Sequence, residues 1–579
     1  MYIRLKTSAA SRNPTVQVIE SFRADGKVKQ KIVASLGVVR NSEDKQRLVA
    51  MAQALINKMT GEQLEFGIAE NIEKSNEDNI SSKPVNPKNL IHIRDRISGF
   101  EDIYGQLIKQ VGFLDEFLEI DKNHNHAFEV SKIIPMLIEK RLQEPASKRR
   151  SLYLDAMEQG ALSFPLHQIY RAMDVLLPYK DSLQTAAWNA AVNLFGQPVD
   201  CLFYDATTLY FESVDQNEVK DFGFSKDGKF NQVQIVFCLL VTPQGVPVGY
   251  EVFPGNTNET KTLKVAIEEL SKRMQIQKVT IVCDRGMLSG DNLEYANNNI
   301  KMKYIIGEKL RKLPVKHQEL IFDFSKYEQV AETLWLQDID HPNRDEKQGA
   351  RLILAYSSER AKKDKKDRER LLKKLELKIS KKKAKPKDFI SNSGVKKYVS
   401  VSGGTATLNR EAILNDEKWD GFFGIVTNHD KETLSAQDVL GHYRGLWQVE
   451  AAFRVSKHDL STRPIYHWTP DRIKSHILIC FLSLVLERHL EVILKQRKTP
   501  VTTTQIHDAL VLCKKIIFQD QKSHRLFEMD SNKPVEAKKI YEAVGLKWRQ
   551  PTRELSNPGA NVVPSSMSVN PQVSGIAPL

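Results

Sequence analysis

The sequence predicts a mixed α/β protein, because a strand-rich stretch is flanked by long stretches with helical periodicity. Between Val199 and Ile306 the predicted order is strand, strand, strand, helix, strand, helix, strand. The preceding block, Ile93–Phe195, places apolar residues at helical spacing, and so does Ile473–Leu494 further on. We therefore expect an α/β core with helical regions before and after it.

Two aspartates follow apolar runs in this core. Asp205 comes after the predicted first strand, Cys201–Tyr204, and Asp284 comes after the predicted fourth strand, Val279–Cys283. Ligands and catalytic groups collect at strand ends in α/β sheets, although a single Asp there is more often a cap or a turn former. The other predicted elements are strands Val233–Val241, Val246–Phe253 and Tyr304–Ile306 and helices Leu263–Met274 and Leu288–Asn298.

The N-terminal segment predicts a β-hairpin. Val16–Arg23 and Val28–Ser35 alternate roughly between apolar and polar residues on either side of Asp25-Gly26, a favoured two-residue turn. A helical pattern runs from Ser42 to Met59, and Lys74–Lys88 has the composition of a linker.

The formal net charge of +13 and the pI near 9.2 favour a polyanionic partner. The charge is concentrated in residues 359–387, which contain fifteen Lys or Arg and five Asp or Glu. Leu371, Leu372, Leu375 and Ile379 recur there at helical spacing, so we expect an amphipathic helix with a lysine-coated outer face. DNA contact is the favoured interpretation, and a merely soluble charged helix is the alternative.

A second basic site lies in the helical block. Lys148, Arg149 and Arg150 begin a predicted helix and could contact DNA phosphates. A solvated helix terminus explains them equally well.

The five cysteines are far apart and include no CxxC pair, which excludes a zinc ribbon and gives no disulfide framework. The N-terminus lacks the apolar core of a signal peptide, and the most apolar stretch, Ile477–Leu486, is too short to span a bilayer. We expect a cytoplasmic protein.

The stretch Tyr443–Lys457 supplies a third carboxylate. If it is a helix, Glu450, Arg454 and Lys457 share one face, and Val449, Ala452, Phe453 and Ser456 share a face that can pack on a core. Taken alone, the charged face is most simply a solvated salt-bridge ladder. Asp205, Asp284 and Glu450 together could instead hold two Mg²⁺ or Mn²⁺ ions.

These residues resemble a known family. Tyr204-Asp205, Asp284-Arg285 and Tyr443…Glu450…Lys457 are similar to the DDE transposases of bacterial insertion sequences. The spacing in the last motif resembles the Tyr-x2-Arg-x3-Glu-x6-Lys signature of insertion-sequence family four and its relatives. One position departs, because Leu446 stands where the signature has Arg. Arg444 lies two residues earlier, on a different face of a regular helix.

The resemblance implies an RNase H-like catalytic core interrupted by a strand-rich insertion, with a helical N-terminal DNA-binding region and a helical C-terminal region. It implies that Asp205, Asp284 and Glu450 bind the metal ions. It implies cleavage at terminal inverted repeats, strand transfer into target DNA and a homodimer, and it implies a bacterial protein associated with the nucleoid. The DNA-contacting candidates are Tyr443, Lys457, Arg454, Arg444, Arg285, Lys148, Arg149 and Arg150.

The expected domain boundaries follow the motifs and composition. They are 1–73, hairpin plus helix; 74–92, linker; 93–198, helical DNA-end-binding domain; 199–306, first part of the core; 307–434, insertion with basic helix 359–387; 435–495, second part of the core; 496–550, helical C-terminal region; and 551–579, disordered tail. Trp335 and Trp419 of the insertion are expected to be core residues rather than base-stacking residues.

Two alternatives remain open at this point. One is a nuclease on the same core that does not transpose, although such an enzyme has little need for the cationic insertion. The other is a transposase-derived DNA-binding repressor without activity, against which the three retained carboxylates weigh.

Overall fold

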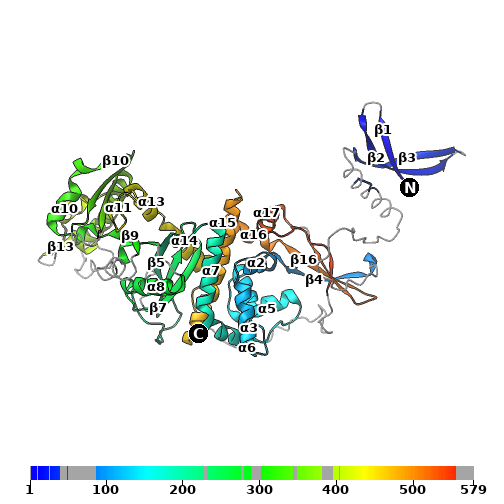
Figure 1. The fold of residues 1–579 in the computed structure, drawn as a ribbon, viewed down its shortest axis with the longest axis horizontal. Helices are drawn as coiled ribbons and strands as arrows, with labels where there is room; N and C mark the ends of the chain where they lie inside the picture. The colour runs from blue at the N-terminus through cyan, green and yellow to red at the C-terminus, as the bar shows by residue number, and fades with distance from the viewer. Residues whose placement is uncertain are drawn as a thin grey trace. The chain divides into compact units, whose positions relative to one another are not determined.

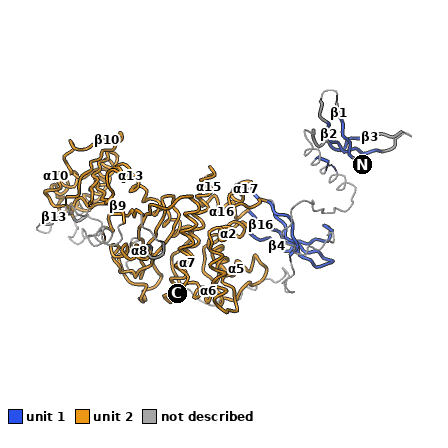
Figure 2. The backbone as a smooth tube through the Cα atoms, viewed as in Figure 1, with its two compact units in different colours: residues 1–97, 513–533, 549–579 blue, residues 98–512, 534–548 orange. Residues whose placement is uncertain are grey.

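The structure, a computed structural model, describes residues 2–38 (without 9–10 and 25–26), 48–49, 52 and 86–555 (without 226–227, 229–230, 275–278, 288–291, 293–301, 343–348, 381–394, 403–404, 500 and 532). Figure 2 shows its two compact units. The smaller unit contains Met1–Ile97, Cys513–Lys533 and Arg549–Leu579, and the larger contains Ser98–Leu512 and Pro534–Trp548.

The N-terminal part of the smaller unit is a three-stranded antiparallel sheet in the order β1-β2-β3. Strands β2 and β3 pair on either side of Asp25-Gly26, which confirms the predicted hairpin. Val16 and Val18 are fully buried against Leu48 and Ala52. Most of the helix predicted from Ser42 and of the predicted linker lies outside the described residues. The strands are β1 (Tyr2–Ser8), β2 (Ser11–Ala24) and β3 (Lys27–Val38).

A second sheet of this unit corrects the predicted C-terminal region. Residues 496–550 were expected to be helical, but they include two strands of a four-stranded antiparallel sheet in the order β18-β17-β16-β4. Strand β16 pairs with β4, more than 400 residues earlier in the chain, so no local pattern could reveal the pairing. The tail also begins with a strand, and its residues 556–579 lie outside the described part. The strands are β4 (Leu90–Ile97), β16 (Lys514–Asp520), β17 (Leu526–Asp530) and β18 (Arg553–Leu555).

The larger unit begins with the predicted helical block (Figure 1). Most of its helices pack on α15 (Pro470–Gln496), whose apolar residues are buried along most of its length. The helices of the block are α2 (Gly99–Gln110), α3 (Phe113–Asn123), α4 (Val130–Gln143), α5 (Lys148–Gln159), α6 (Leu166–Leu176) and α7 (Lys180–Phe195). Near the end of the chain α16 (Thr503–Val511) and α17 (Val535–Ala543) join the same unit.

A nine-stranded mixed sheet in the order β10-β11-β12-β15-β9-β8-β5-β6-β7 follows the helical block. Strand β5 pairs in parallel with β8, and β8 pairs in parallel with β9, whereas the other neighbouring strands are antiparallel. The first five strands in sequence are β5 (Cys201–Tyr210), β6 (Gln234–Val241), β7 (Pro247–Pro254), β8 (Thr280–Cys283) and β9 (Lys303–Glu308), with helix α8 (Glu259–Met274) between β7 and β8. The helix predicted at Leu288–Asn298 falls almost wholly outside the described residues.

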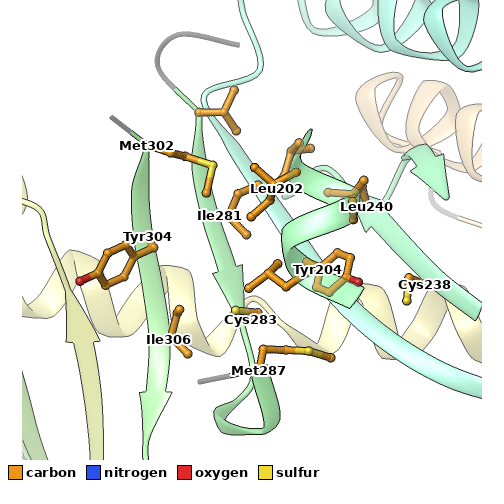
Figure 3. Close-up of a cluster of buried hydrophobic side chains, with 14 of the residues drawn as sticks. Leu202, Tyr204, Cys238, Leu240, Ile281, Cys283, Met287, Met302, Tyr304 and Ile306 are labelled. Atoms are coloured by element: carbon orange, nitrogen blue, oxygen red, sulfur yellow. The ribbon is translucent and has the colours of Figure 1, made fainter. Parts of the chain in front are cut away.

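One face of this sheet is covered by an apolar cluster. Figure 3 shows Leu202 and Tyr204 of β5 beside Ile281 and Cys283 of β8, and Leu263 of α8 packs on the same cluster. Side chains alternate between the two faces of a strand, so residues 203 and 205 lie on the opposite face.

The strands after β9 extend the same sheet. Strand β15 (Phe422–Thr427) pairs antiparallel with β9, and β12 (Arg351–Ser357), β11 (Leu334–Asp340) and β10 (Glu328–Ala331) continue outward. Strands β13 (Val399–Ser402) and β14 (Thr405–Leu408) form a separate pair. Trp335 and Trp419 are half-buried among aromatic rings, in line with the expected core packing.

The basic segment forms helix α11 (Ser358–Ile379), which has the expected amphipathic pattern. Leu375 is buried and Leu371, Leu372 and Ile379 pack around it, whereas the lysines are exposed. Arg368 is 6% exposed and forms an ion pair with Asp420. Residues 381–394, which include the end of the predicted basic helix, lie outside the described part. Helices α10 (Val315–Phe322) and α12 (Arg410–Glu417) flank this region.

The chain returns to the sheet through α13 (Ala436–Arg444), α14 (Trp447–Arg454) and a π-helical turn, Val455–Asp459, before α15. Within the described part of the chain, no helix has the length and apolar character that a membrane span requires.

Burial of Glu487 on α15 predicts a pH-dependent stability. Burial raises the pKa of Glu487 to about 8, although the hydroxyl of Tyr104 donates a hydrogen bond to it. Because the folded-state pKa lies above the unfolded value near 4.5, the stabilisation is complete below pH 4.5 and is lost as the pH rises to about 8. Between these pH values the free energy of unfolding should fall by at most about 1.4 kcal/mol per pH unit. Glu487→Gln should remove this dependence, which thermal unfolding measured from pH 5 to 8 would show. Exposed Glu536→Gln is the control, and an unchanged slope in Glu487→Gln would refute the assignment.

Candidate active site

Asp205 and Asp284 are neighbours across two parallel strands. The register of β5 and β8 pairs Tyr204 with Cys283, where β8 ends, so each aspartate occupies the next position. Adjacent strands lie about 4.8 Å apart, which brings the two carboxylates close together on one face. Asp205 does not end its strand as expected, because β5 continues to Tyr210 along its antiparallel partner β6.

Glu450 approaches this face from helix α14. Val449, Ala452, Phe453 and Ser456 are buried, as the helical pattern predicted, and the ring of Phe453 lies 6.0 Å from that of Phe237 on β6. The carboxylate of Glu450 is on the exposed side of the helix. The three acids therefore line one cavity, which has a volume of about 450 Å³. The residues that line it are Asp205, Asp284, Tyr443, Arg444, Leu446, Trp447, Val449 and Glu450.

Tyr443 contacts one of the acids directly. Its hydroxyl donates a hydrogen bond of 3.3 Å to Oδ1 of Asp284. Burial, together with the nearby charge of Asp284, raises the pKa of Tyr443, so the phenol stays protonated and remains a donor. A Cβ at Gly307 of β9 would lie 2.4 Å from the tyrosine hydroxyl, so the absence of a side chain there makes room for it.

Tyr443–Lys457 is not the single regular helix that the pattern suggested. Helix α13 ends at Arg444, Gly445 and Leu446 form the connection, and α14 begins at Trp447. A Cβ at Gly445 would lie 2.3 Å from the ring of Phe203, so the bend is pressed closely against β5. Because of this bend, Arg444 and Leu446 both line the cavity, although they would lie on different faces of a regular helix.

Lys457 lies in the π-helical turn that follows α14. Its ammonium donates a hydrogen bond of 2.7 Å to Oγ1 of Thr207, two residues beyond Asp205 on the same face of β5. Lys457 is thus held close to Asp205 without being part of the cavity lining. Arg454 is exposed and is likewise absent from that lining.

A larger groove of about 800 Å³ adjoins this cavity at Asp284. Asp284 and Tyr443 line both cavities, and Arg285 lines the groove. Its walls come from the segment after β9, from helix α11 and from the start of β15. The charged residues along it are of mixed sign: Arg285, Glu308, Lys309, Arg311, Lys312, Arg360, Asp364, Asp367, Arg368, Asp416 and Asp420.

The three basic residues at the start of α5 differ from one another. Arg149 and Arg150 are exposed, and Arg150 forms an ion pair with Glu144. Lys148 is only 3% exposed. The solvated-terminus interpretation therefore fits the two arginines but not the lysine.

The sequence pattern did not single out Trp447, whose side chain is 58% exposed at the cavity. Only its position directly after the bend at Gly445–Leu446 could have indicated that Trp447 faces the cavity. Helical periodicity does not reveal that bend.

The three carboxylates fit divalent metal ions in their chemistry, since hard oxygen donors suit Mg²⁺ and Mn²⁺. Their arrangement is open: among the described residues, no group of three or more His, Cys, Asp or Glu side chains is placed so that it could already hold an ion. The two aspartates come from the sheet, whereas Glu450 lies on the exposed side of α14.

Two protein-family models match this chain. The model described as "Transposase DDE domain" matches residues 198–486, which contain all three acids. The chain is a DDE transposase. The second model, "IS1634 family transposase, N-terminal domain", matches residues 3–70 of the transposase. No curated protein matches it.

These matches support the transposase assignment and, through the DDE domain, an RNase H-like core and a general dependence on divalent metal. They do not support the narrower expectation of insertion-sequence family four, because the N-terminal match is to the IS1634 family, which is a different family.

The close approach of Gly307 to the hydroxyl of Tyr443 can be tested by substitution. Gly307→Ala should displace the tyrosine hydroxyl and slow DNA cleavage roughly tenfold, as should Tyr443→Phe, which removes that hydroxyl. The double variant should be no slower than Gly307→Ala alone, because displacement of the ring already removes the hydrogen bond of the hydroxyl. Gly441→Ala, where a Cβ meets nothing within 4 Å, is the control. Additive losses in single-turnover cleavage would contradict the coupling.

Proposed function

We propose that the transposase cleaves DNA and transfers the cut strand at the cavity lined by Asp205, Asp284 and Glu450. The observation that carries this proposal is the convergence of the three carboxylates on one cavity, although 79 and 166 positions separate them in the sequence. The three residues would hold two Mg²⁺ or Mn²⁺ ions. Ions of this kind activate an attacking oxygen and stabilise a leaving oxygen in phosphodiester chemistry.

The remaining residues of the cavity position the DNA in this proposal. The protonated hydroxyl of Tyr443 and the ammonium of Lys457 are donors that suit phosphate oxygens beside the cut site. Arg444 supplies the cation that the family-four signature places at the position of Leu446. The bend at Gly445 supports this substitution, because it lets both positions face the cavity. Exposed Arg454 and Arg285 contact the backbone further from the cut.

The groove next to the cavity is the proposed path of the DNA. It leads from Asp284 and Tyr443 past Arg285 towards helix α11, whose exposed lysines add positive charge beside the mixed charges of the groove. In this proposal residues 307–434 act as a DNA-binding insertion in the catalytic core. The N-terminal region and helical block 93–198 bind the inverted-repeat ends, and a homodimer joins the two ends of the element.

Each acid can be tested by removing one charge. Asp205→Asn, Asp284→Asn and Glu450→Gln should each slow metal-dependent cleavage of an inverted-repeat duplex by about a hundredfold or more, with duplex binding largely retained. Asp200→Asn, at the exposed position just before the strand that carries Asp205, is the matched control. Cleavage at the wild-type rate by any of the three variants would remove that residue from the site.

The lysines of α11 can be tested by salt dependence. Lys363→Gln with Lys366→Gln should lower the slope of log K against log salt by up to roughly 0.9 for each DNA phosphate that the helix no longer neutralises. Both lysines are exposed, and exposed Lys538 and Lys539 of α17, changed to Gln, provide a control of equal charge. Equal slopes for the wild type and the α11 variant would show that this helix does not contact DNA.

A further inference from the structure

A third cavity, of about 310 Å³, lies in the larger unit away from the three acids. It is formed by the end of α4, the start of α5, part of α6 and the segment 461–476. Five of its residues carry cationic or imidazole side chains: Arg141, Lys148, Arg463, His467 and His476. None of the described residues that line it is Asp or Glu.

Lys148 is the central residue of this cavity. Its side chain is 3% exposed and makes no hydrogen bond or ion pair with any residue that the structure describes. Burial, and secondarily the charge of Arg141, lowers the pKa of Lys148 to about 7. A buried ammonium without a counterion is costly, and native proteins usually pair such groups.

The neighbouring groups add donors but no negative charge. Arg141, 4% exposed, donates only to the backbone carbonyls of Leu460, Ser461 and Ala146, so its charge is not neutralised. Within the described structure, Nδ1 of buried His476 has no hydrogen-bond partner. Asp174 already forms an ion pair with Arg472 at 3.2 Å.

The backbone geometry favours the same charge. The cavity contains the start of α5, a helix of 12 residues that Ser147 caps by accepting a hydrogen bond from the backbone N–H of Arg150. The N-terminal end of a helix carries a partial positive charge and attracts anions. Buried cations, an imidazole nitrogen and a helix N-terminus thus converge on one unneutralised cavity.

We propose that this cavity binds a phosphate group and that, given the proposed function, the phosphate belongs to the DNA backbone. Its wall is continuous with the catalytic elements. Ser461 and Arg463 follow the π-helical turn that carries Lys457, and Ile465 pairs with Phe211 just beyond β5. A phosphodiester held here fixes the DNA against the two elements that position Glu450 and Asp205.

The first experiment tests the cavity without DNA. Inorganic phosphate, compared with chloride at equal ionic strength, should raise the melting temperature of the wild-type protein, and Lys148→Met should abolish that rise. Without phosphate, Lys148→Met should melt at a higher temperature than the wild type, because it removes an uncompensated buried charge. Lys122→Met, an exposed lysine of the helical block, is the control. A phosphate response that Lys148→Met leaves unchanged would overturn the proposal.

The second experiment identifies the source of the phosphate. Lys148→Met should weaken binding of an inverted-repeat duplex roughly tenfold and lower the salt slope by about 0.9. Arg463→Gln, at a half-buried position of the same wall, should act in the same direction and guards against a folding defect in the first variant. If the phosphate response is lost but duplex affinity is unchanged, the DNA source is refuted and the cavity takes a free anion.

Failure of the proposed function would look different from failure of the cavity. If the wild-type protein binds no duplex but keeps a phosphate response that depends on Lys148, the proposed function fails and the phosphate site stands.

Discussion

The parallel pairing of β5 with β8 is the constraint on which the candidate site depends. It places Asp205 and Asp284 directly after the paired residues Tyr204 and Cys283, and it does so through backbone hydrogen bonds that no side chain can adjust. Two like charges held this close repel each other and therefore favour a cation between them. The apolar side chains at Tyr204 and Cys283 fix the register from the other face, because a shift by one residue would put aspartate into the hydrophobic cluster.

The third acid is held by packing and not by the sheet. Buried Phe453 and Ala452 fix α14 on β5 and β6, while the bend at Gly445 sets the direction from which the helix arrives. Glu450 can therefore adjust its side chain while its backbone stays in place.

Much of the catalytic-core fold and of the candidate site could be predicted from the sequence. Apolar runs predicted the strands β5 to β9, and the positions of Asp205, Asp284 and Glu450 relative to those runs pointed to three acids that line one cavity, because these signals are local. What failed was non-local or depended on small contacts. Strand β16 takes its conformation from β4 at the other end of the chain, the bend between α13 and α14 depends on Gly445 meeting Phe203, and burial of Lys148 depends on α15 and the segment before it. Periodicity records which face of an element is apolar, and it does not record what that face meets.

The pairing of β15 with β9 has a consequence for how this enzyme can be divided. Gly307 of β9 lies against the hydroxyl of Tyr443, and one edge of β9 pairs with β15. Excising the insertion would leave that edge without a partner, and unprotected strand edges invite aggregation. The insertion is therefore not a detachable accessory: a minimal enzyme built from residues 199–306 and 435–495 alone would lose part of the sheet that supports the candidate active site.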